Sequence, residues 1–265
     1  MTRFGELRTP YDVQIALRSG PTPAFHWFLD PEQLIDRSLL QQHLWEPYST
    51  WAVEALVKSG MHVLDAGANM GYYTILLSHL VGSTGHVLAF EAMPEPAALT
   101  IAHCRLNQVE NAEVRQHALG RKSADPAETF FNYSWPPTRC EQAPACVETI
   151  ALDDLRLSRL DFAKVDLDGS ELDFVVGAED TLRRLRPAIL LEVCDYTLRQ
   201  TAGLSRDANY IYGAKTREML EFLVVLGYGF LREQDFTRIT ADEVLAHDDL
   251  SKMSVNVICQ VESAC

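Results

Sequence analysis

The stretch VLDAGANMGYYTILLSHL, residues 63–80, combines an apolar strand, a loop containing glycine and asparagine, and an amphipathic helix. This order is typical of the first crossover in a nucleotide-binding α/β sheet. Gly67 and Gly71 allow a tight turn and a close approach of the backbone, and Asn69 tolerates positive φ better than most residues. The stretch therefore predicts a ligand-binding loop at the carboxyl end of the first strand of a sheet.

Strands and helices alternate along most of the chain after this stretch. The patterns predict strands at 85–92, 112–120, 160–169 and 187–194, and helices at 94–108, 170–186 and 216–228. Strands separated by helices join through right-handed crossovers, so we expect an α/β fold with a mostly parallel sheet and helices on both faces. The last two predicted strands, 227–234 and 254–262, are joined by a loop alone, which predicts an antiparallel hairpin at one edge.

The chain divides into an arm and a main domain. Residues 31–44 and 47–60 have helical spacing of apolar residues with proline at each start, so we expect residues 1–59 to form an N-terminal helical arm that covers the domain 60–265. Within that domain, 121–149 is an insertion. It reads as a hairpin of two extended segments around a proline-rich loop, and its Trp-Pro-Pro tip is a candidate lid over a ligand.

The composition restricts the partners of the protein. The 265 residues include 23 Lys and Arg against 37 Asp and Glu, a formal net charge of −14. Such an acidic surface disfavours binding to nucleic-acid backbones and to anionic membranes. The sequence contains no secretory signal and no apolar run long enough to span a membrane, and its six cysteines form no C-x-x-C pair. We therefore expect a cytoplasmic protein with reduced thiols.

The loop excludes some nucleotides. A dinucleotide loop requires G-x-G-x-x-G, but here Asn69 stands at the second glycine and Tyr72 at the third, which disfavours nicotinamide cofactors. Asp65 opens the loop, where it would repel a pyrophosphate and attract a cationic amino group. Glu91 ends the second predicted strand, where a carboxylate accepts hydrogen bonds from ribose hydroxyls. S-adenosylmethionine carries an amino group, a carboxylate and a ribose, so it suits this arrangement.

Two blocks of the sequence point to a known family. They are DAGANMGYYT with GHVLAFEAMPE, and LDFAKVDLDGSELDFVVGAEDTLRRLRPAILLEV. Together they resemble the FkbM family of S-adenosylmethionine-dependent methyltransferases. Ala92 and Asp168 depart from the commoner Pro and Glu of the family. The resemblance covers about residues 60–195 and implies a Rossmann-like class I methyltransferase fold. It also implies S-adenosylmethionine as methyl donor and a hydroxyl on a sugar, polyketide or other natural product as acceptor.

With this resemblance, a set of cofactor-binding residues can be assigned. Asp65 orients the amino group, Tyr72 or Thr74 meets the methionine carboxylate, Glu91 binds the ribose, and small residues after two strands flank the adenine. The predicted cofactor-binding residues are Asp65, Gly67, Ala68, Asn69, Tyr72, Thr74, Glu91, Ala92, Ala118 and Asp166.

The segment KVDLDG supplies the catalytic candidates. Alternation places Lys164, Asp166 and Asp168 on one face of a strand, and a buried lysine needs a partner such as Asp166, Asp65 or Glu192. One interpretation is an internal ion-pair network without chemical role. The other makes Asp166 the group that takes a proton from the acceptor or positions it, with Asp168 and Glu192 as further catalytic candidates. Together with Glu171, these carboxylates could also hold Mg²⁺, although the metal-free interpretation is preferred and Glu171 more simply begins the next helix.

The sequence thus predicts an O-methyltransferase that acts on a small molecule. An N-methyltransferase on the same fold and a non-catalytic S-adenosylmethionine-binding protein are the alternatives. Trp45 and Tyr48 are, with the aromatic loop 130–137, candidates for covering the acceptor. The sequence leaves open whether the protein forms a homodimer.

Overall fold

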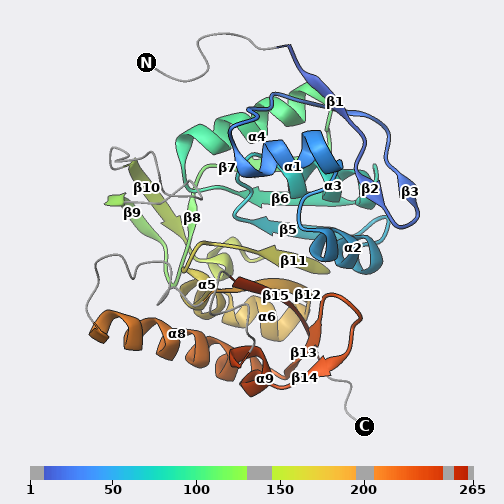
Figure 1. Ribbon diagram of the computed structural model, residues 1–265. Helices are drawn as coiled ribbons and strands as arrows, with labels where there is room; N and C mark the ends of the chain where they lie inside the picture. The colour runs from blue at the N-terminus through green and yellow to red at the C-terminus, as the bar shows by residue number, and fades with distance from the viewer. Residues whose placement is uncertain (1–8, 130–144, 195–205, 247–253, 262–265) are drawn as a thin grey trace.

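The computed structural model describes residues 9–129, 145–194, 206–246 and 254–261 (Figure 1). Its central feature is an eight-stranded sheet in the order β14-β13-β15-β12-β11-β5-β6-β7. The strands of this sheet are β5 (His62–Ala66), β6 (His86–Phe90), β7 (Ala112–Arg115), β11 (Phe162–Val165), β12 (Ala188–Cys194), β13 (Tyr228–Arg232), β14 (Arg238–Ile239) and β15 (Ser254–Val261).

The strand directions confirm the predicted sheet. Strands β7, β6, β5, β11 and β12 are parallel neighbours. Strand β15 lies between β12 and β13 and runs antiparallel to both, so the last two predicted strands do form an antiparallel pair at one end of the sheet. The two-residue strand β14, which the sequence did not predict, pairs with β13 and forms the outermost edge.

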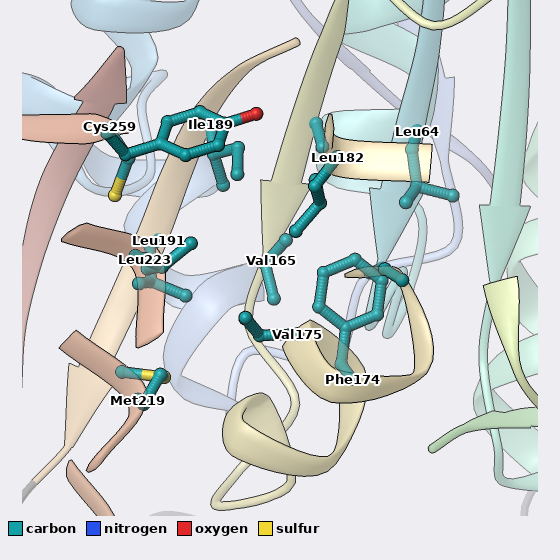
Figure 2. Packing of buried hydrophobic residues seen from close by; sticks show 14 of the residues in the cluster. Leu64, Val165, Phe174, Val175, Leu182, Ile189, Leu191, Met219, Leu223 and Cys259 are labelled. Carbon is teal, nitrogen blue, oxygen red and sulfur yellow. The ribbon is translucent and has the colours of Figure 1, made fainter. Parts of the chain in front are cut away.

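Helices cover both faces of the sheet, as predicted (Figure 1). Val63 and Leu64 of β5 point into opposite apolar cores, because side chains alternate along a strand. In Figure 2, Phe174 and Val175 of α5 point toward Val165 of β11 in one of these cores. The helices are α3 (Tyr72–Val81) and α4 (Pro94–Leu106) on one face, and α5 (Glu171–Gly177), α6 (Glu179–Leu185), α8 (Arg206–Val225) and α9 (Ala241–Leu245) on the other.

The predicted third strand, 112–120, is wrong as a single strand. β7 ends at Arg115, where the chain turns and the amide of His117 donates a hydrogen bond to the Arg115 carbonyl at 3.1 Å. This local bond ends the ladder with β6. The next residues, β8 (Ala118–Leu119), pair instead with β10 in a separate three-stranded sheet.

The predicted helix 170–186 is two helices in the structure. α5 ends at Gly177 and α6 begins at Glu179. A Cβ at Gly177 would lie 2.0 Å from the carbonyl oxygen of Gly120, so the helix packs directly on the backbone of another segment at this point. The chain bends at that close contact, which the helical periodicity of the sequence does not reveal.

The insertion contains the two extended segments that the sequence predicts. They are β9 (Ala124–Thr129) and β10 (Ala145–Ile150), which pair antiparallel. A 3-10 turn (Leu152–Leu155) follows β10 and leads to β11. The Trp-Pro-Pro tip, proposed above as a lid, lies outside the described residues.

The N-terminal arm contains the two predicted helices and also strands that the sequence did not predict. Trp27 of the arm is fully buried, stacks on Tyr72 at a centroid distance of 6.4 Å and meets His103 edge-on at 5.1 Å. The arm therefore belongs to the same apolar core as α3 and α4. Its elements are β1 (Tyr11–Val13), β2 (Ala16–Leu17), β3 (Gly20–Pro21), β4 (Phe25–Trp27), α1 (Leu34–Gln42) and α2 (Pro47–Leu56).

Within the described ranges, no helix is long and apolar enough to cross a membrane.

Candidate active site

A cavity of about 80 Å³ lies where β5, β6 and β11 end at their carboxyl edge. The loop before α3, the residues after β6 and the end of β11 form most of its wall, and the N-terminal arm closes the remaining side. This is the edge at which ligands bind in sheets of this kind. The lining residues are Ile35, Trp45, Gly67, Ala68, Asn69, Met70, Tyr72, Tyr73, Glu91, Met93, Pro96, Lys164, Asp166 and Asp168.

The loop after β5 has the backbone that its sequence predicts. Gly67, Asn69 and Gly71 all have positive φ, at 90°, 50° and 93°. A Cβ at Gly67 would lie 1.8 Å from the carbonyl oxygen of Asp166, so only glycine allows the loop to approach the end of β11 this closely. The amides of Gly67 and Ala68 both donate to the Phe90 carbonyl at 2.9 Å, which ties the loop to β6.

Glu91 lies at the end of β6 and lines the cavity. Its two carboxylate oxygens accept hydrogen bonds from the backbone amides of Asn69 at 2.8 Å and Met93 at 2.9 Å. Burial raises the pKa of Glu91 to about 7, although these two bonds oppose the shift. Each oxygen retains a lone pair for a further donor. Glu91 therefore fixes the loop and can also accept ribose hydroxyls.

Asp65 and Thr74 form a buried pair beneath the loop. The Thr74 hydroxyl donates to Asp65 Oδ2 at 2.6 Å, and both side chains are fully buried. Thr74 was predicted to meet the methionine carboxylate, but its hydroxyl is directed at Asp65 and it does not line the cavity. Asp65 Oδ1 accepts no hydrogen bond from any residue that the structure describes. Burial raises the pKa of Asp65, and the Lys164 charge opposes that rise.

Two tyrosines at the start of α3 connect the cavity to the arm. The Tyr72 hydroxyl lies 2.9 Å from Thr50 Oγ1 and accepts from the Trp45 amide at 3.4 Å. Trp45 lines the cavity, as predicted for a covering residue, whereas Tyr48 is 47% exposed and packs against Trp51. The Tyr72 ring lines the wall while its hydroxyl anchors the arm.

Lys164 and Asp166 form an ion pair at the end of β11. Lys164 Nζ lies 2.6 Å from Asp166 Oδ2, and the lysine side chain is 3% exposed. Of the three partners that the sequence allowed for Lys164, Asp166 is the one in direct contact. The nearby carboxylates raise the pKa of Lys164 despite its burial. Glu192 on β12 is hydrogen-bonded to Asp166, and burial with the Asp166 charge raises the pKa of Glu192 well above its ordinary range.

The comparison with known proteins identifies the family. The chain matches the methyltransferase FkbM domain over residues 65–232. The chain belongs to the FkbM methyltransferase family. It is 25% identical over 161 residues to Methyltransferase 1 of Beauveria bassiana (strain ARSEF 2860), a match that covers 50% of this chain and 64% of that relative.

Solved methyltransferase structures are similar to this FkbM-family chain at low identity. The FkbM methyltransferase of Methylobacillus flagellatus KT is 18% identical, with a TM-score of 0.43 over 56% of this chain and 37% of that one. The O-methyltransferase of Bacillus cereus, in complex with SAH, is 17% identical, with a TM-score of 0.47 over 81% of this chain and 79% of that one.

The structure brings most of the predicted site residues of this FkbM domain to one cavity. Seven of them line it: Gly67, Ala68, Asn69, Tyr72, Glu91, Asp166 and Asp168. Five do not: Asp65, Thr74, Ala92, Ala118 and Glu192. Ala118 follows the turn that ends β7 and belongs to the smaller sheet, which places it away from the predicted position at the end of the third strand.

Sequence reasoning missed five lining residues and the burial of one acid. Ile35 comes from the arm, Met70 and Tyr73 lie in the loop and at the start of α3, and Met93 and Pro96 lie at the start of α4. Glu171, predicted to begin a helix or to add a carboxylate beside Asp168 and Glu192, is buried, and its Oε1 accepts from the amides of Leu167 at 2.9 Å and Gly169 at 3.1 Å. Met93 could have been found from its place two residues after the ribose-binding candidate Glu91.

Three of these acidic groups could hold a metal ion. Carboxylate oxygens of Asp166, Asp168 and Glu192 lie within 4.8 Å of one another, and oxygen ligands suit Mg²⁺. However, the Lys164 ammonium already contacts Asp166 and supplies a positive charge at the same place. The geometry therefore favours an internal ion pair between Lys164 and Asp166 over a metal site, and Mg²⁺ remains the less favoured prediction.

Proposed function

We propose that this FkbM-family chain is an S-adenosylmethionine-dependent methyltransferase. The observation that carries the proposal is the cavity at the carboxyl edge of the sheet, bounded by the Gly67–Gly71 loop and by Glu91. The loop and Glu91 together suit a ligand made of a nucleoside and an amino acid better than they suit a dinucleotide.

The residues present fit this cofactor. Asp65 Oδ1 is a buried acceptor without a donor among the described residues, which suits an ammonium group held directly or through water. Glu91 lines the cavity with a carboxylate that would accept hydrogen bonds from the ribose hydroxyls, and Met93 lines it with an apolar side chain that would contact the adenine. When bound, S-adenosylmethionine supplies an electrophilic methyl group on a sulfonium. The backbone of Gly67 and Ala68 would line the cofactor, because both residues line the cavity.

We extend the proposal to methylation of a hydroxyl on a small molecule. Asp166 lines the cavity next to the loop, where an acceptor must approach the methyl group. Its carboxylate is held by Lys164 at 2.6 Å and by Glu192, so it is fixed in place. Such a carboxylate accepts a hydrogen bond from an acceptor hydroxyl and orients it. Alignment of donor and acceptor can supply much of the rate of methyl transfer.

We also propose that the acceptor is a natural product and that the protein is cytoplasmic. The proposal further includes that the protein binds neither nucleic acids nor membranes. These proposals are supported by the family resemblance and by the net charge of −14. Methylation of an amine instead of a hydroxyl is the alternative that the same cavity allows.

Calorimetry tests the cofactor. S-adenosylmethionine and S-adenosylhomocysteine should both bind, and NAD⁺ should bind at least about tenfold more weakly, because the loop lacks the second and third glycines of a pyrophosphate site. Tighter binding of NAD⁺ would overturn the proposal. A screen of hydroxylated and amine acceptors, read by mass spectrometry of the product, then distinguishes O- from N-methylation.

A further inference from the structure

Glu46, a residue of the N-terminal arm, has an unusual conformation for its position. It precedes the first residue of α2 and has φ 43° and ψ 75°, which is a left-handed conformation that non-glycine residues seldom adopt. A polar side chain at this position commonly accepts a hydrogen bond from its own helix, but Glu46 makes no such bond. Strained residues of this kind cluster at functional sites, where the surrounding structure holds them.

The Glu46 carboxylate is directed at the wall of the cavity. Its Oε2 accepts a hydrogen bond from the Tyr73 hydroxyl at 2.8 Å, and the Asn256 amide of β15 donates to the Ser49 hydroxyl of α2 at 2.9 Å. Lys164 Nζ lies over the Tyr73 ring at 4.6 Å from its centroid, so Tyr73 connects Glu46 to the ion pair with Asp166. Burial raises the pKa of the Glu46 carboxyl, and the Lys164 charge lowers it.

The charges around Lys164 do not balance. One ammonium faces three carboxyl groups, those of Glu46, Asp65 and Asp166, and Lys164 interacts with each of them electrostatically. Burial raises the pKa of Glu46 and of Asp65, so their negative charges develop as the pH rises, and when all are ionised the net charge of the four groups is 1 − 3 = −2. Lys164 and Asp65 are buried and Glu46 and Asp166 are half-buried, so water screens these charges less than it does at the surface and the excess negative charge acts on whatever occupies the cavity. Glu46 supplies one of these charges from outside the sheet.

We propose that Glu46 is a positioning residue that makes the cavity prefer the sulfonium of the methyl donor over the neutral thioether of the product. This inference rests on the proposed function. When the methyl group leaves, the electron pair of the broken C–S bond stays on sulfur and the new bond forms with a lone pair of the acceptor. The cofactor therefore loses one positive charge, and a cavity with excess negative charge holds the product less well than the donor.

Calorimetric affinities for S-adenosylmethionine and S-adenosylhomocysteine test the inference without any acceptor. The variants are Glu46→Gln, which removes the charge and keeps an acceptor for Tyr73, and Glu46→Asp, which keeps the charge. The control is Glu54→Gln on the same helix, whose carboxylate accepts from the amides of Arg18 and Ser19, both at 2.8 Å. This control disturbs the docking of the arm but not the cavity.

We expect Glu46→Gln to weaken S-adenosylmethionine binding by about tenfold relative to S-adenosylhomocysteine at about pH 8. This is the effect of one unit charge roughly 10 Å away in a dielectric of about 20. Glu46→Asp and Glu54→Gln should keep the ratio of the two affinities close to that of the wild type. An analogue with an ammonium in place of the sulfonium should lose affinity for Glu46→Gln to the same extent as S-adenosylmethionine.

Two results would overturn the inference. One is an equal loss of affinity for both ligands in a folded Glu46→Gln protein, which would make Glu46 a structural residue only. The other concerns Glu46→Asp and is used if thermal unfolding shows that Glu46→Gln does not fold. A change of less than twofold in the ratio of the two affinities in Glu46→Asp then supports the inference, and a larger change contradicts it. If the wild type binds neither ligand, it is the proposed function that fails instead.

Discussion

Replacing Glu171 by glutamine should stabilise the protein at high pH and leave its stability unchanged at low pH. The Glu171 carboxyl is buried at the start of α5, and burial raises its pKa from 4.5 to about 7. The folded state therefore holds a proton on Glu171 that the unfolded chain releases. Stability from this group is fully present below pH 4.5 and is lost as the pH rises through about 7.

The size of the effect follows from the same two values. The pKa of Glu171 is 4.5 in the unfolded chain and about 7 in the folded protein, and each pKa unit of difference corresponds to about 1.4 kcal/mol. Above pH 7 the ionised carboxyl therefore lowers the free energy of unfolding by about 3 kcal/mol. Glutamine retains an oxygen for the amides of Leu167 and Gly169 but carries no charge. Glu171→Gln should thus recover up to about 3 kcal/mol at pH 8 and almost nothing at pH 4.5.

Urea unfolding of the wild type and of Glu171→Gln, at about pH 4.5, 6 and 8, measures this dependence. Glu113→Gln is a matched control, because that carboxyl is exposed and its pKa is lowered by Arg115. The difference between the Glu171 variant and the wild type should grow with pH across this window. A difference that is constant with pH, or that shrinks as pH rises, would refute the reasoning.

Three further substitutions test the cavity. Glu91→Ala should weaken S-adenosylhomocysteine binding about tenfold or more in calorimetry, since a hydrogen bond to a charged group contributes about 1.5–3 kcal/mol; unchanged affinity in a folded variant places the ribose elsewhere. Gly67→Ala should lower the Tm markedly, because its Cβ would lie 1.8 Å from the Asp166 carbonyl oxygen, and a wild-type Tm contradicts this. Asp166→Asn should change the Tm little, because Lys164 still faces Asp65 and Glu46, but it should lower turnover about 100-fold. A variant that melts early but turns over normally would show that Asp166 has a structural role only.

The loop and the sheet could be predicted from the sequence because their determinants are local. Gly67 and Gly71 adopt the positive φ values that glycine permits, and strands separated by helices leave few possible topologies. The break after Arg115 was not predictable in this way. It depends on a turn at Gln116 and His117, whose residue types are not typical of turns, and on pairing between β8 and the distant strand β10.

Tertiary packing decides the parts of the site that the sequence left open. Thr74 lies on the first turn of α3, where the sequence suggested a cofactor contact, but the rotation of that helix directs its hydroxyl to Asp65. Glu46 precedes Pro47 at a helix start, which is a pattern typical of an exposed position. It is close to Lys164 only because the arm packs on α3 through Trp27 and Tyr72, a contact between segments far apart in the chain.

Buried and half-buried acids with raised pKa values gather at the carboxyl edge of this sheet. Glu91, Glu171 and Glu233 each have a pKa raised to about 7 by burial, and the pKa of Glu192 is raised further by Asp166. None of them needs to be acidic for the apolar cores to form, and each lowers stability at neutral pH in the absence of a ligand. Such a concentration of costly acids is expected where a site has been arranged for a ligand rather than for stability. A cationic ligand would offset part of that cost. Glu46 on the arm and Asp65 beneath the loop would both contribute to this effect, because each adds a negative charge near the cavity.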